Sequence, residues 1–564
     1  MQPQPAADLT PDVLAASPVH WPGTRLRWTT ANVDEGLPGT VTPLTWSMYF
    51  PPTEATMRGC WVDLGVLPKS QRPIPDDVDA RFLSVAYGHA IANLDQMGRM
   101  AARVPGGSAA LMEAQLFGSV QRGGDPEPTG LRKMRRYPFV IAKFPVALRR
   151  AMRALEPCAD ETARWWRATV FEHEGLRGDS AVRALVEARR RFETILVIHM
   201  VLSMACQGVM GRVETLAINA GLEGLQHELI KSEEGTAEFD LVRDLWRLSA
   251  DRITVEDFLR RHGYHGPREG LVESTVWRED SRPILELAAT YRSRQASEDV
   301  DQLVVRRRHE HAAAVQRLEQ ALGPIRAIPA RALVRFAAHA PTWRETGRAS
   351  MLRAVDGARA ASRIVGRDLA DAGVLDDPAD IRFLTIDEIA EGDRDRWPEL
   401  VGRRRREHAA FDRIVLPHVW RGEPPVEVTA PAVETQDDTT QIDTTQAGRW
   451  PGMLEGLGVS AGIAEGVVRV IHDLDEADID EGTVLVCRAT DPSWASLFPL
   501  AEAVITDVGS AMSHAAIVCR ELGLPCVAGT RTGTTTLRDG MRVRVDGTTG
   551  CVEILGGAPP DQYA

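Results

Sequence analysis

The stretch TDVGSAMSHAAIVCRELGLPCVAG, residues 506–529, decides how the C-terminal part of the chain folds. The apolar residues 503–505 before it predict a buried strand, and residues 507–511 predict a tight turn. Ser513 is placed to cap a helix over residues 515–521. Amides at a helix start stabilise negative charge, so a phosphate on His514 would meet a favourable field. The pattern suits a histidine that carries a phosphoryl group, and it equally fits a histidine that only caps a helix.

The sequence around this stretch predicts a small α/β domain. Short β-like runs alternate with turns from residue 457 to residue 555, and two helical patterns lie between them. The pairs Asp539-Gly540 and Asp546-Gly547 mark turns. We therefore expect an α/β domain over residues 450–556, followed by a short tail over residues 557–564.

The segment before this domain has the composition of a linker. Residues 423–449 are rich in Thr, Asp, Gln and Pro and poor in large apolar side chains, so they cannot bury enough surface to offset their ordering entropy. As a flexible coil the segment would span on the order of 25–30 Å, enough for the attached domain to visit two sites. We predict a flexible linker here and a disordered N-terminus over residues 1–20.

Residues 21–422 predict a mainly α-helical domain. Apolar residues recur there at helical spacing, and Arg, Glu, Ala and Leu dominate. The predicted helical stretches are 79–103, 145–155, 179–222, 300–322, 330–340, 350–372 and 403–411.

Composition narrows the class of protein. The chain has 564 residues, too many for one ordinary core, and a formal net charge of -13, which argues against a nucleic-acid or anionic-membrane surface. The apolar run 194–210 is interrupted by His199 and Gln207 and predicts a buried helix. The N-terminus lacks the layout of a signal peptide, so we expect a cytoplasmic protein. The seven cysteines form no CxxC pair and indicate neither a disulfide framework nor a metal site.

The stretch 506–529 resembles the phosphohistidine, or swivelling, domain of the phosphoenolpyruvate-utilising enzyme family, and Ser513-His514-Ala515 matches the family's Ser-His-Ala segment. In that family the histidine of this segment is phosphorylated during turnover, so the resemblance implies that His514 is the catalytic residue. The residues it implies for the phosphoryl-binding loop are Thr506, Gly509, Ser510 and Ser513. The family loop usually has two adjacent glycines, whereas here Ser510 follows Gly509.

The resemblance extends ahead of the linker, to the substrate-binding region of the rifampin phosphotransferase branch of the same family. The segments that carry it, in the family's order, are 28–50, 262–285, 340–355, 376–389 and 403–411. Family members place an ATP-binding domain before these two parts, and we see no Gly-rich phosphate loop of the P-loop kind in this sequence. We therefore expect no intrinsic cofactor, and expect ATP and Mg²⁺ to bind at a separate ATP-binding subunit that charges His514.

Arginines are candidates for holding the phosphoryl oxygens, because the guanidinium fork binds two oxygens at once. The resemblance points to two pairs, Arg404 with Arg405 and Arg344 with Arg348, as phosphate contacts. Solvated basic faces and surface ion pairs are the alternatives for both pairs.

The segment HGYHGPREG, residues 262–270, supplies candidates for the acceptor side. His265 could act as base toward a substrate hydroxyl, and Glu269 could place a hydroxyl or a cation. A loop whose polar groups satisfy its own backbone is the alternative. Thr42 and Thr45 suit a wall of the substrate cavity, and equally the capping of a helix.

These features predict a phosphotransferase that moves a phosphoryl group through a phosphohistidine to a hydroxylated small molecule. A phosphorylation-assisted dehydratase and a non-catalytic small-molecule binding protein are the alternatives. Neither the acceptor nor the oligomeric state follows from the sequence.

Overall fold

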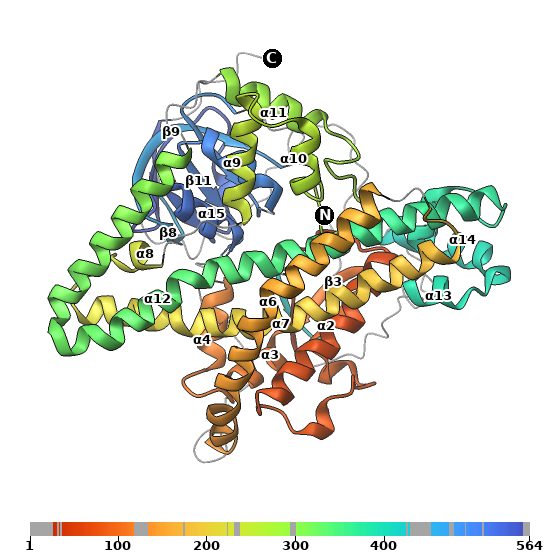
Figure 1. Cartoon of the computed structure of the whole chain (residues 1–564), viewed down its shortest axis with the longest axis horizontal. Coiled ribbons are helices and arrows are strands. Elements are labelled where there is room, and N and C mark those ends of the chain that lie inside the picture. The colour runs from red at the N-terminus through yellow and green to blue at the C-terminus, as the bar shows by residue number, and fades with distance from the viewer. Residues whose placement is uncertain are drawn as a thin grey trace, which may run out of the picture.

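The computed structural model describes residues 26–30, 33, 36–117, 134–172, 175–222, 224–230, 237–293, 300–424, 427–428, 453–472, 479–490, 492–509 and 513–556. The predicted N-terminal segment 1–20, the predicted tail 557–564 and most of the predicted linker 423–449 lie outside these ranges. The described chain has a mainly helical N-terminal part and a strand-rich α/β C-terminal part (Figure 1), which confirms the predicted fold class.

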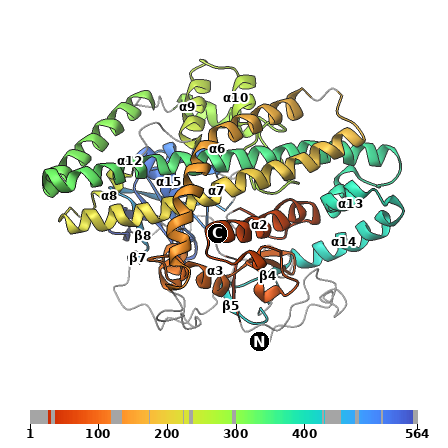
Figure 2. The same ribbon diagram turned by 60° about the horizontal axis from the view of Figure 1, so that its bottom comes forward.

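Four helices build the frame of the N-terminal part: α2 (Pro43–Asp63), α6 (Tyr137–Phe171), α7 (Asp179–Asn219) and α12 (Val300–Asp371). The long helices α7 and α12 run side by side across the molecule (Figure 2). Their facing side chains, such as Leu185 and Val355, are fully buried in a shared core, and each such side chain stabilises the packing by about 1.5–3 kcal/mol. Gly323, with a φ of 71°, interrupts α12 just before Pro324.

Helix α7 is long and apolar enough, by length and composition, to cross a membrane. In the structure its apolar side chains pack against the neighbouring helices: Phe192 lies in one core with Leu44, and Ile195 and Leu202 lie in another with Leu155. The prediction of a buried helix over residues 194–210 is confirmed, because these contacts use the apolar face in the protein core.

Shorter elements complete the N-terminal part. Two of the helices, α10 and α13, begin with a capping box, formed by Thr254 with Asp257 and by Thr385 with Glu388. The shorter helices are α3 (Leu94–Ala101), α4 (Ala109–Phe117), α8 (Gln226–Leu229), α9 (Ala237–Ser249), α10 (Val255–His262), α11 (Arg282–Ser293), α13 (Ile386–Glu391) and α14 (Trp397–Phe411). The 3-10 turns are η1 (Lys69–Gln71), η2 (Val78–Ala80), η3 (Pro378–Phe383) and η4 (Arg394–Arg396).

The predicted helix over residues 79–103 is wrong for most of its length. The structure has a hairpin of β2 (Leu83–Ala86) and β3 (His89–Asn93) there, and only α3 is helical. Tyr87 and Gly88 both have positive φ, 46° and 74°, which is the backbone of a tight hairpin turn. The hairpin joins β1 (Arg27–Thr29) and β5 (Val419–Arg421) in an antiparallel sheet of order β2-β3-β1-β5. A small two-stranded sheet pairs β4 (Ile414–Val415) with β6 (Glu427–Val428).

The C-terminal part is built on an eight-stranded sheet of order β7-β14-β13-β9-β10-β11-β12-β8. The strands β9, β10, β11 and β12 are parallel neighbours, and the outer strands pair antiparallel. The strand bounds are β7 (Met453–Glu455), β8 (Leu457–Ser460), β9 (Ile463–Val470), β10 (Thr483–Cys487), β11 (Ala503–Thr506), β12 (Cys526–Ala528), β13 (Arg542–Asp546) and β14 (Cys551–Gly556).

One face of this sheet shares a core with helices from the N-terminal part. Helix α15 (His514–Leu522) and the turns η6 (Pro492–Ser496) and η7 (Phe498–Leu500) lie on that face together with α9 and α11, while α16 (Gly533–Thr536) contacts β10 and β11. In α11, the Tyr291 hydroxyl donates to the Ser496 carbonyl at 2.8 Å. Figures 1 and 2 both show α15 on the side of the C-terminal part that lies toward α12.

Candidate active site

The start of α15 places His514 at the end of a tightly packed loop. Ser513 is the N-cap, and its hydroxyl accepts a hydrogen bond from the amide of Ala516 at 3.4 Å. A Cβ on Gly509 would lie 3.0 Å from Thr506 Oγ1 and 3.2 Å from Ser513 Oγ, so a larger residue would push the loop apart. The predicted loop residue Ser510 lies outside the described residues.

Asp507 fixes the other side of the same loop. Its carboxylate accepts hydrogen bonds from the Thr530 hydroxyl at 2.9 Å and from the Thr534 amide at 3.2 Å. The Thr530 amide donates to the carbonyl of Thr506, the last residue of β11, at 3.0 Å. The loop is therefore tied to two neighbouring segments before α15 begins, which holds the His514 backbone in place.

The His514 side chain is buried, with 1% of its surface exposed. Neither ring nitrogen has a hydrogen-bond partner among the residues that the structure describes. Burial, followed by the nearby Arg348, His265 and Arg344, holds the pKa of His514 well below the usual value of 6.5. The imidazole is therefore neutral at physiological pH, with a lone pair available for a bond to phosphorus.

The structure brings the predicted pair Arg344 and Arg348 to His514. Both residues lie on α12 with i, i+4 spacing, so they share one face of that helix. Both act electrostatically on the imidazole. Two guanidinium groups beside a neutral imidazole form a suitable place for the oxygens of a phosphoryl group.

His265 and Glu269 form a buried pair close to His514. The distance from His265 Nδ1 to Glu269 Oε2 is 2.7 Å, and the two side chains are 4% and 2% exposed. Burial raises the pKa of Glu269 to about 8. His265 also acts electrostatically on His514. An imidazole paired with a carboxyl group is a common arrangement for a general base.

A network of buried charges holds the loop of His265. Arg359 donates to the carbonyls of Glu269 and Leu271, both at 2.8 Å. The Asp356 carboxylate binds Arg359 at 2.6 Å and Arg278 at 2.8 Å. Because both charge signs are buried and paired, the loop is fixed to α12, the helix that also carries Arg344 and Arg348.

A pair of carboxyl groups also adjoins the arginines, and it was not predicted from the sequence. Glu238 in α9 and Glu345 in α12 lie within hydrogen-bonding distance of each other and are 3% and 0% exposed. His199 of α7 is also close to Glu345, and burial with the nearby Arg344 lowers the pKa of His199 to about 4. Glu345 lies between the two predicted arginines in sequence, which was the available signal; Glu238 carries no sequence motif.

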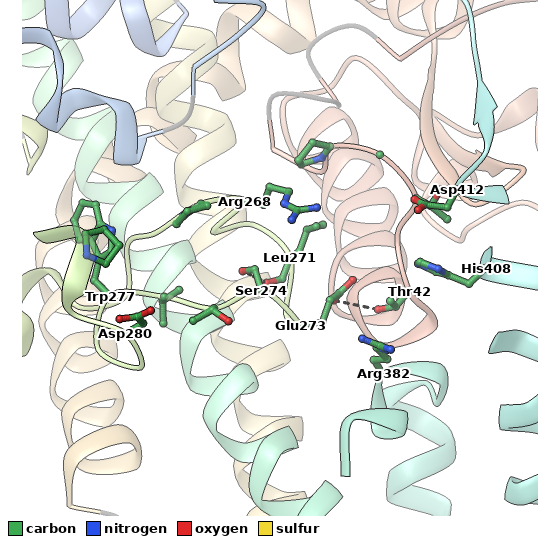
Figure 3. A pocket seen from close by; sticks show the side chains of 17 residues that line it. Thr42, Arg268, Leu271, Glu273, Ser274, Trp277, Asp280, Arg382, His408 and Asp412 are labelled. Carbon is green, nitrogen blue, oxygen red and sulfur yellow. Dashed lines mark hydrogen bonds between the residues drawn. The ribbon is translucent and has the colours of Figure 1, made fainter. Parts of the chain in front are cut away.

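A cavity of about 620 Å³ lies next to the loop of His265 and extends to His408 of α14 (Figure 3); His265 and His514 themselves do not line it. Arg268, in the loop of His265, lines it, as does Trp277, whose ring centroid lies 5.6 Å from that of His265. The predicted residue Thr42 also lines the cavity and donates to Glu273 at 3.1 Å, the dashed bond in Figure 3. The cavity carries charged and titratable side chains of both signs: Arg268, Glu273, Asp280, Arg382, His408 and Asp412.

Thr45, the other predicted cavity residue, does not line the cavity. Its side chain is fully buried, and its hydroxyl donates to Glu273 at 2.5 Å and accepts from the Val272 amide at 2.8 Å. Thr42 is also the N-cap of α2. The cavity and the capping interpretations therefore both apply to Thr42, whereas Thr45 positions Glu273.

Arg404 and Arg405 do not join the cluster. Arg404 pairs with Glu388 at 2.7 Å, and Arg405 pairs with Asp380. Their helix α14 lies at the end of the molecule away from α15 in both views (Figures 1 and 2). In this structure the two side chains link α14 to α13 and η3, because these elements present the nearest carboxylates. The structure gives no support to the predicted role of Arg404 and Arg405 as phosphate contacts.

Metal ligation is not indicated at the cluster. Within the described ranges, no group of three or more His, Cys, Asp or Glu side chains is arranged to hold a metal ion. The cations of the site are the arginine side chains.

Comparison with known proteins finds a related domain in each of the two parts of the chain. Residues 479–550 match the mobile domain of PEP-utilising enzymes, and residues 181–345 match the fourth domain of rifampicin phosphotransferase. The first match contains His514, and the second contains Arg344 and Glu345.

Three relatives show the extent of the similarity. A rifampicin phosphotransferase of Streptomyces sp is 40% identical over 190 residues, which are 33% of this chain and 20% of the relative. The rifampicin phosphotransferase of Bacillus subtilis (strain 168) is 34% identical over 190 residues, with the same coverage of 33% and 20%. A phosphotransferase of that organism named YvkC is 36% identical over 194 residues, 34% of this chain and 23% of the relative. The matches span less than a quarter of the length of these relatives.

Proposed function

Because the chain matches the PEP-utilising enzyme family through its mobile domain and through the fourth domain of rifampicin phosphotransferase, we propose that it transfers a phosphoryl group from His514 to a hydroxylated small molecule. One observation carries the proposal. His514 is a buried, neutral imidazole at the start of α15, opposite the positively charged pair Arg344 and Arg348.

The buried cluster supplies a role for each group in the transfer. The nitrogen–phosphorus bond on His514 breaks as the acceptor oxygen forms its bond to phosphorus. The acceptor proton passes to His265, whose Nδ1 is paired with Glu269. Arg344 and Arg348 hold the phosphoryl oxygens, where the fork of each guanidinium stabilises the charge of the transition state. After transfer His514 is again neutral, as its surroundings require.

The acceptor is proposed to bind in the 620 Å³ cavity lined by Thr42 and Arg268. Its position next to the loop of His265 supports this assignment, since a hydroxyl group bound there would be near the proposed base. A cavity of this size fits a small molecule. The mixture of acidic and basic side chains on its wall favours a polar acceptor over an apolar one.

Charging of His514 is proposed to come from ATP bound with Mg²⁺ on a separate subunit, and the protein is proposed to act in the cytoplasm, where ATP is available. The proposal rests on the family resemblance described above, in which an ATP-binding domain precedes two parts like those matched here at residues 181–345 and 479–550. The transfer half of the reaction can be studied without this partner, because a small phosphoryl donor such as phosphoramidate can phosphorylate histidine side chains directly.

The test uses the full chain charged with radiolabelled phosphoramidate. The charged protein is freed of donor and mixed with separate panels of sugars, amino sugars, phenols and polyketide alcohols. Label should move to an acceptor from the wild-type protein, and His514→Gln should transfer none. Release of label only as inorganic phosphate with every panel would contradict the proposed transfer.

A further inference from the structure

Glu238 and Glu345 place two carboxyl groups within hydrogen-bonding distance of each other in the protein interior, where α9 packs against α12. They come from different helices, α9 and α12, and each side chain is at least nine-tenths buried. Both oxygens of Glu345 and Oε2 of Glu238 receive no hydrogen bond from any donor in the described part of the chain. Two ionised carboxylates in this position would repel each other strongly, whereas a proton between them would supply the missing donor.

The charged groups that face this pair come from several elements. Arg344 and Arg348 of α12 and His199 of α7 face Glu345, and Arg348 also acts on Glu238. Tyr264, which follows α10, is close enough to Glu238 for the carboxyl charge to affect the phenol. The pair therefore adjoins the two arginines proposed to hold the phosphoryl group.

We propose that Glu238 and Glu345 share one proton and that this proton keeps the phosphoryl-binding cluster positively charged. The inference rests on the proposed function for its role, and on the contact and burial of the two carboxyl groups for its existence. With one proton the pair carries a single negative charge, so the two arginines and the two carboxyl groups together keep a net positive charge. Without the proton the pair would neutralise both arginines, and the site would lose its attraction for a phosphoryl dianion.

The surroundings of the two carboxyl groups determine which of them carries the proton. Burial and the adjacent Glu345 raise the pKa of Glu238 well above its usual range. Hydrogen bonding to Glu238 and the positive charge of Arg348 and Arg344 overcome burial and lower the pKa of Glu345. Glu238 is therefore the protonated member, and Glu345 is the ionised member, whose charge interacts with the two arginines.

If the two carboxyl groups share a proton, the extent of His514 phosphorylation (phosphoryl loading) should decline at alkaline pH. As Glu238 loses its proton, the second negative charge weakens the binding of the phosphoryl group by the arginines. Glu238→Gln carries an amide of the same shape that cannot ionise, so its loading should stay constant where that of the wild type falls. Glu345→Gln removes the negative charge beside the arginines and should lengthen the lifetime of the phosphohistidine roughly tenfold. The exposed Glu256→Gln is the matched control.

Loading is measured with phosphoramidate as donor, by the mass of the intact chain at pH values from 6 to about 10. Each variant is also made in the Glu269→Gln background, so that the ionisation of Glu269 at about pH 8 does not contribute. An alkaline decline that is the same in Glu238→Gln and wild type would overturn the proposal, as would a Glu345→Gln phosphohistidine no longer-lived than that of Glu256→Gln.

An infrared measurement tests the shared proton without any phosphoryl transfer. The difference spectrum between wild type and Glu238→Gln at neutral pH should contain one protonated carboxyl band, and the Glu256→Gln difference spectrum should contain none. If the band is present but His514 is never phosphorylated, the shared proton stands and the proposed function fails. If His514 is phosphorylated and the band is missing, the proposed function stands and the shared proton is rejected. Should Glu238→Gln not fold, the same band is followed through an alkaline titration of the wild type and of Glu345→Gln, and a band unchanged between them would also reject the pair.

Discussion

The imidazole of His265 and the carboxyl group of Glu269 lie 2.7 Å apart, buried together in the loop whose Arg268 lines the cavity. Both residues belong to one loop, which Arg359 fastens to α12 through two backbone carbonyls. The proposed base is therefore held on the same helix as the proposed phosphate-binding arginines. This common support fixes the position of the proposed base relative to Arg344 and Arg348.

Glu269 should set the pH dependence of the transfer step. Its pKa is raised to about 8 by burial. Above that pH the ionised Glu269 accepts a hydrogen bond from Nδ1–H of His265, which leaves the lone pair of the other ring nitrogen free to act as base. Loss of phosphohistidine to the acceptor, or to water, should therefore accelerate as the pH rises through about 8. Glu269→Gln should transfer about 10- to 100-fold more slowly and lose this rise, as measured by following the phosphoenzyme after removal of donor. A rise of unchanged size in the variant would exclude Glu269 from this role.

The arginine assignments can be separated by matched substitutions. Arg344→Gln and Arg348→Gln should each lower phosphoryl transfer at least about 100-fold, because each removes a charge proposed to stabilise the transition state. Arg404→Gln should leave transfer unchanged and lower the free energy of unfolding by about 1 kcal/mol, because it breaks the ion pair with Glu388. Transfer rates and denaturant unfolding of the three variants provide the comparison. The reverse order of effects on transfer would restore the sequence-based assignment of Arg404.

Buried His514 should make the fold sensitive to acid. Its pKa in the folded protein lies well below the usual 6.5, so below that pH the unfolded chain binds a proton that the folded protein does not. The contribution of His514 to the free energy of unfolding is therefore fully present above pH 6.5 and is lost progressively as the pH falls below that value. Thermal unfolding midpoints at pH 7 and pH 5 should therefore differ less in His514→Gln than in the wild type. An equal difference would mean that His514 is solvated in the resting protein.

Gly509 should tolerate no side chain. An added Cβ would lie 3.0 Å from Thr506 Oγ1 and 3.1 Å from the Ala528 Cβ, so Gly509→Ala should lower the free energy of unfolding by about 1–3 kcal/mol and reduce phosphoryl loading. Gly208 lies within α7 and has open space around it; Gly208→Ala should therefore be neutral or stabilise by up to about 1 kcal/mol. Denaturant titration of the two variants distinguishes them. Equal stability would show that the loop can open without loss.

Local patterns predicted those features that depend on neighbouring residues. The strand, turn, cap and helix around His514 follow from a short continuous segment, and the structure has β11 ending at Thr506 and α15 beginning at His514. The shared helix face of Arg344 and Arg348 also follows from their i, i+4 spacing, whereas their role as phosphate contacts comes from the family resemblance and stays a prediction. The hairpin at residues 83–93 was missed because its apolar residues also fit a helical period, and only the Tyr87-Gly88 turn decides between the two.

Features that depend on contacts between distant segments could not be predicted in the same way. The proximity of Glu238 to Glu345 requires α9 to pack beside α12, and the sharing of one core by α11 and the C-terminal sheet joins segments about 200 residues apart, as the Tyr291–Ser496 hydrogen bond shows. The ion pairs of Arg404 and Arg405 could not be predicted for the same reason. A basic run on a helix has no information about which carboxylates lie opposite it, and Glu388 and Asp380 occupy that position.

The most direct test of the account is the location of the phosphoryl group after charging. Wild-type protein is incubated with phosphoramidate, or with ATP, Mg²⁺ and a candidate ATP-binding subunit, then digested near neutral pH and sequenced by tandem mass spectrometry. The account predicts one phosphoryl group, on the peptide containing His514, and none on His514→Gln. Phosphorylation at another residue with His514 unmodified, or equal labelling of the variant, would contradict it.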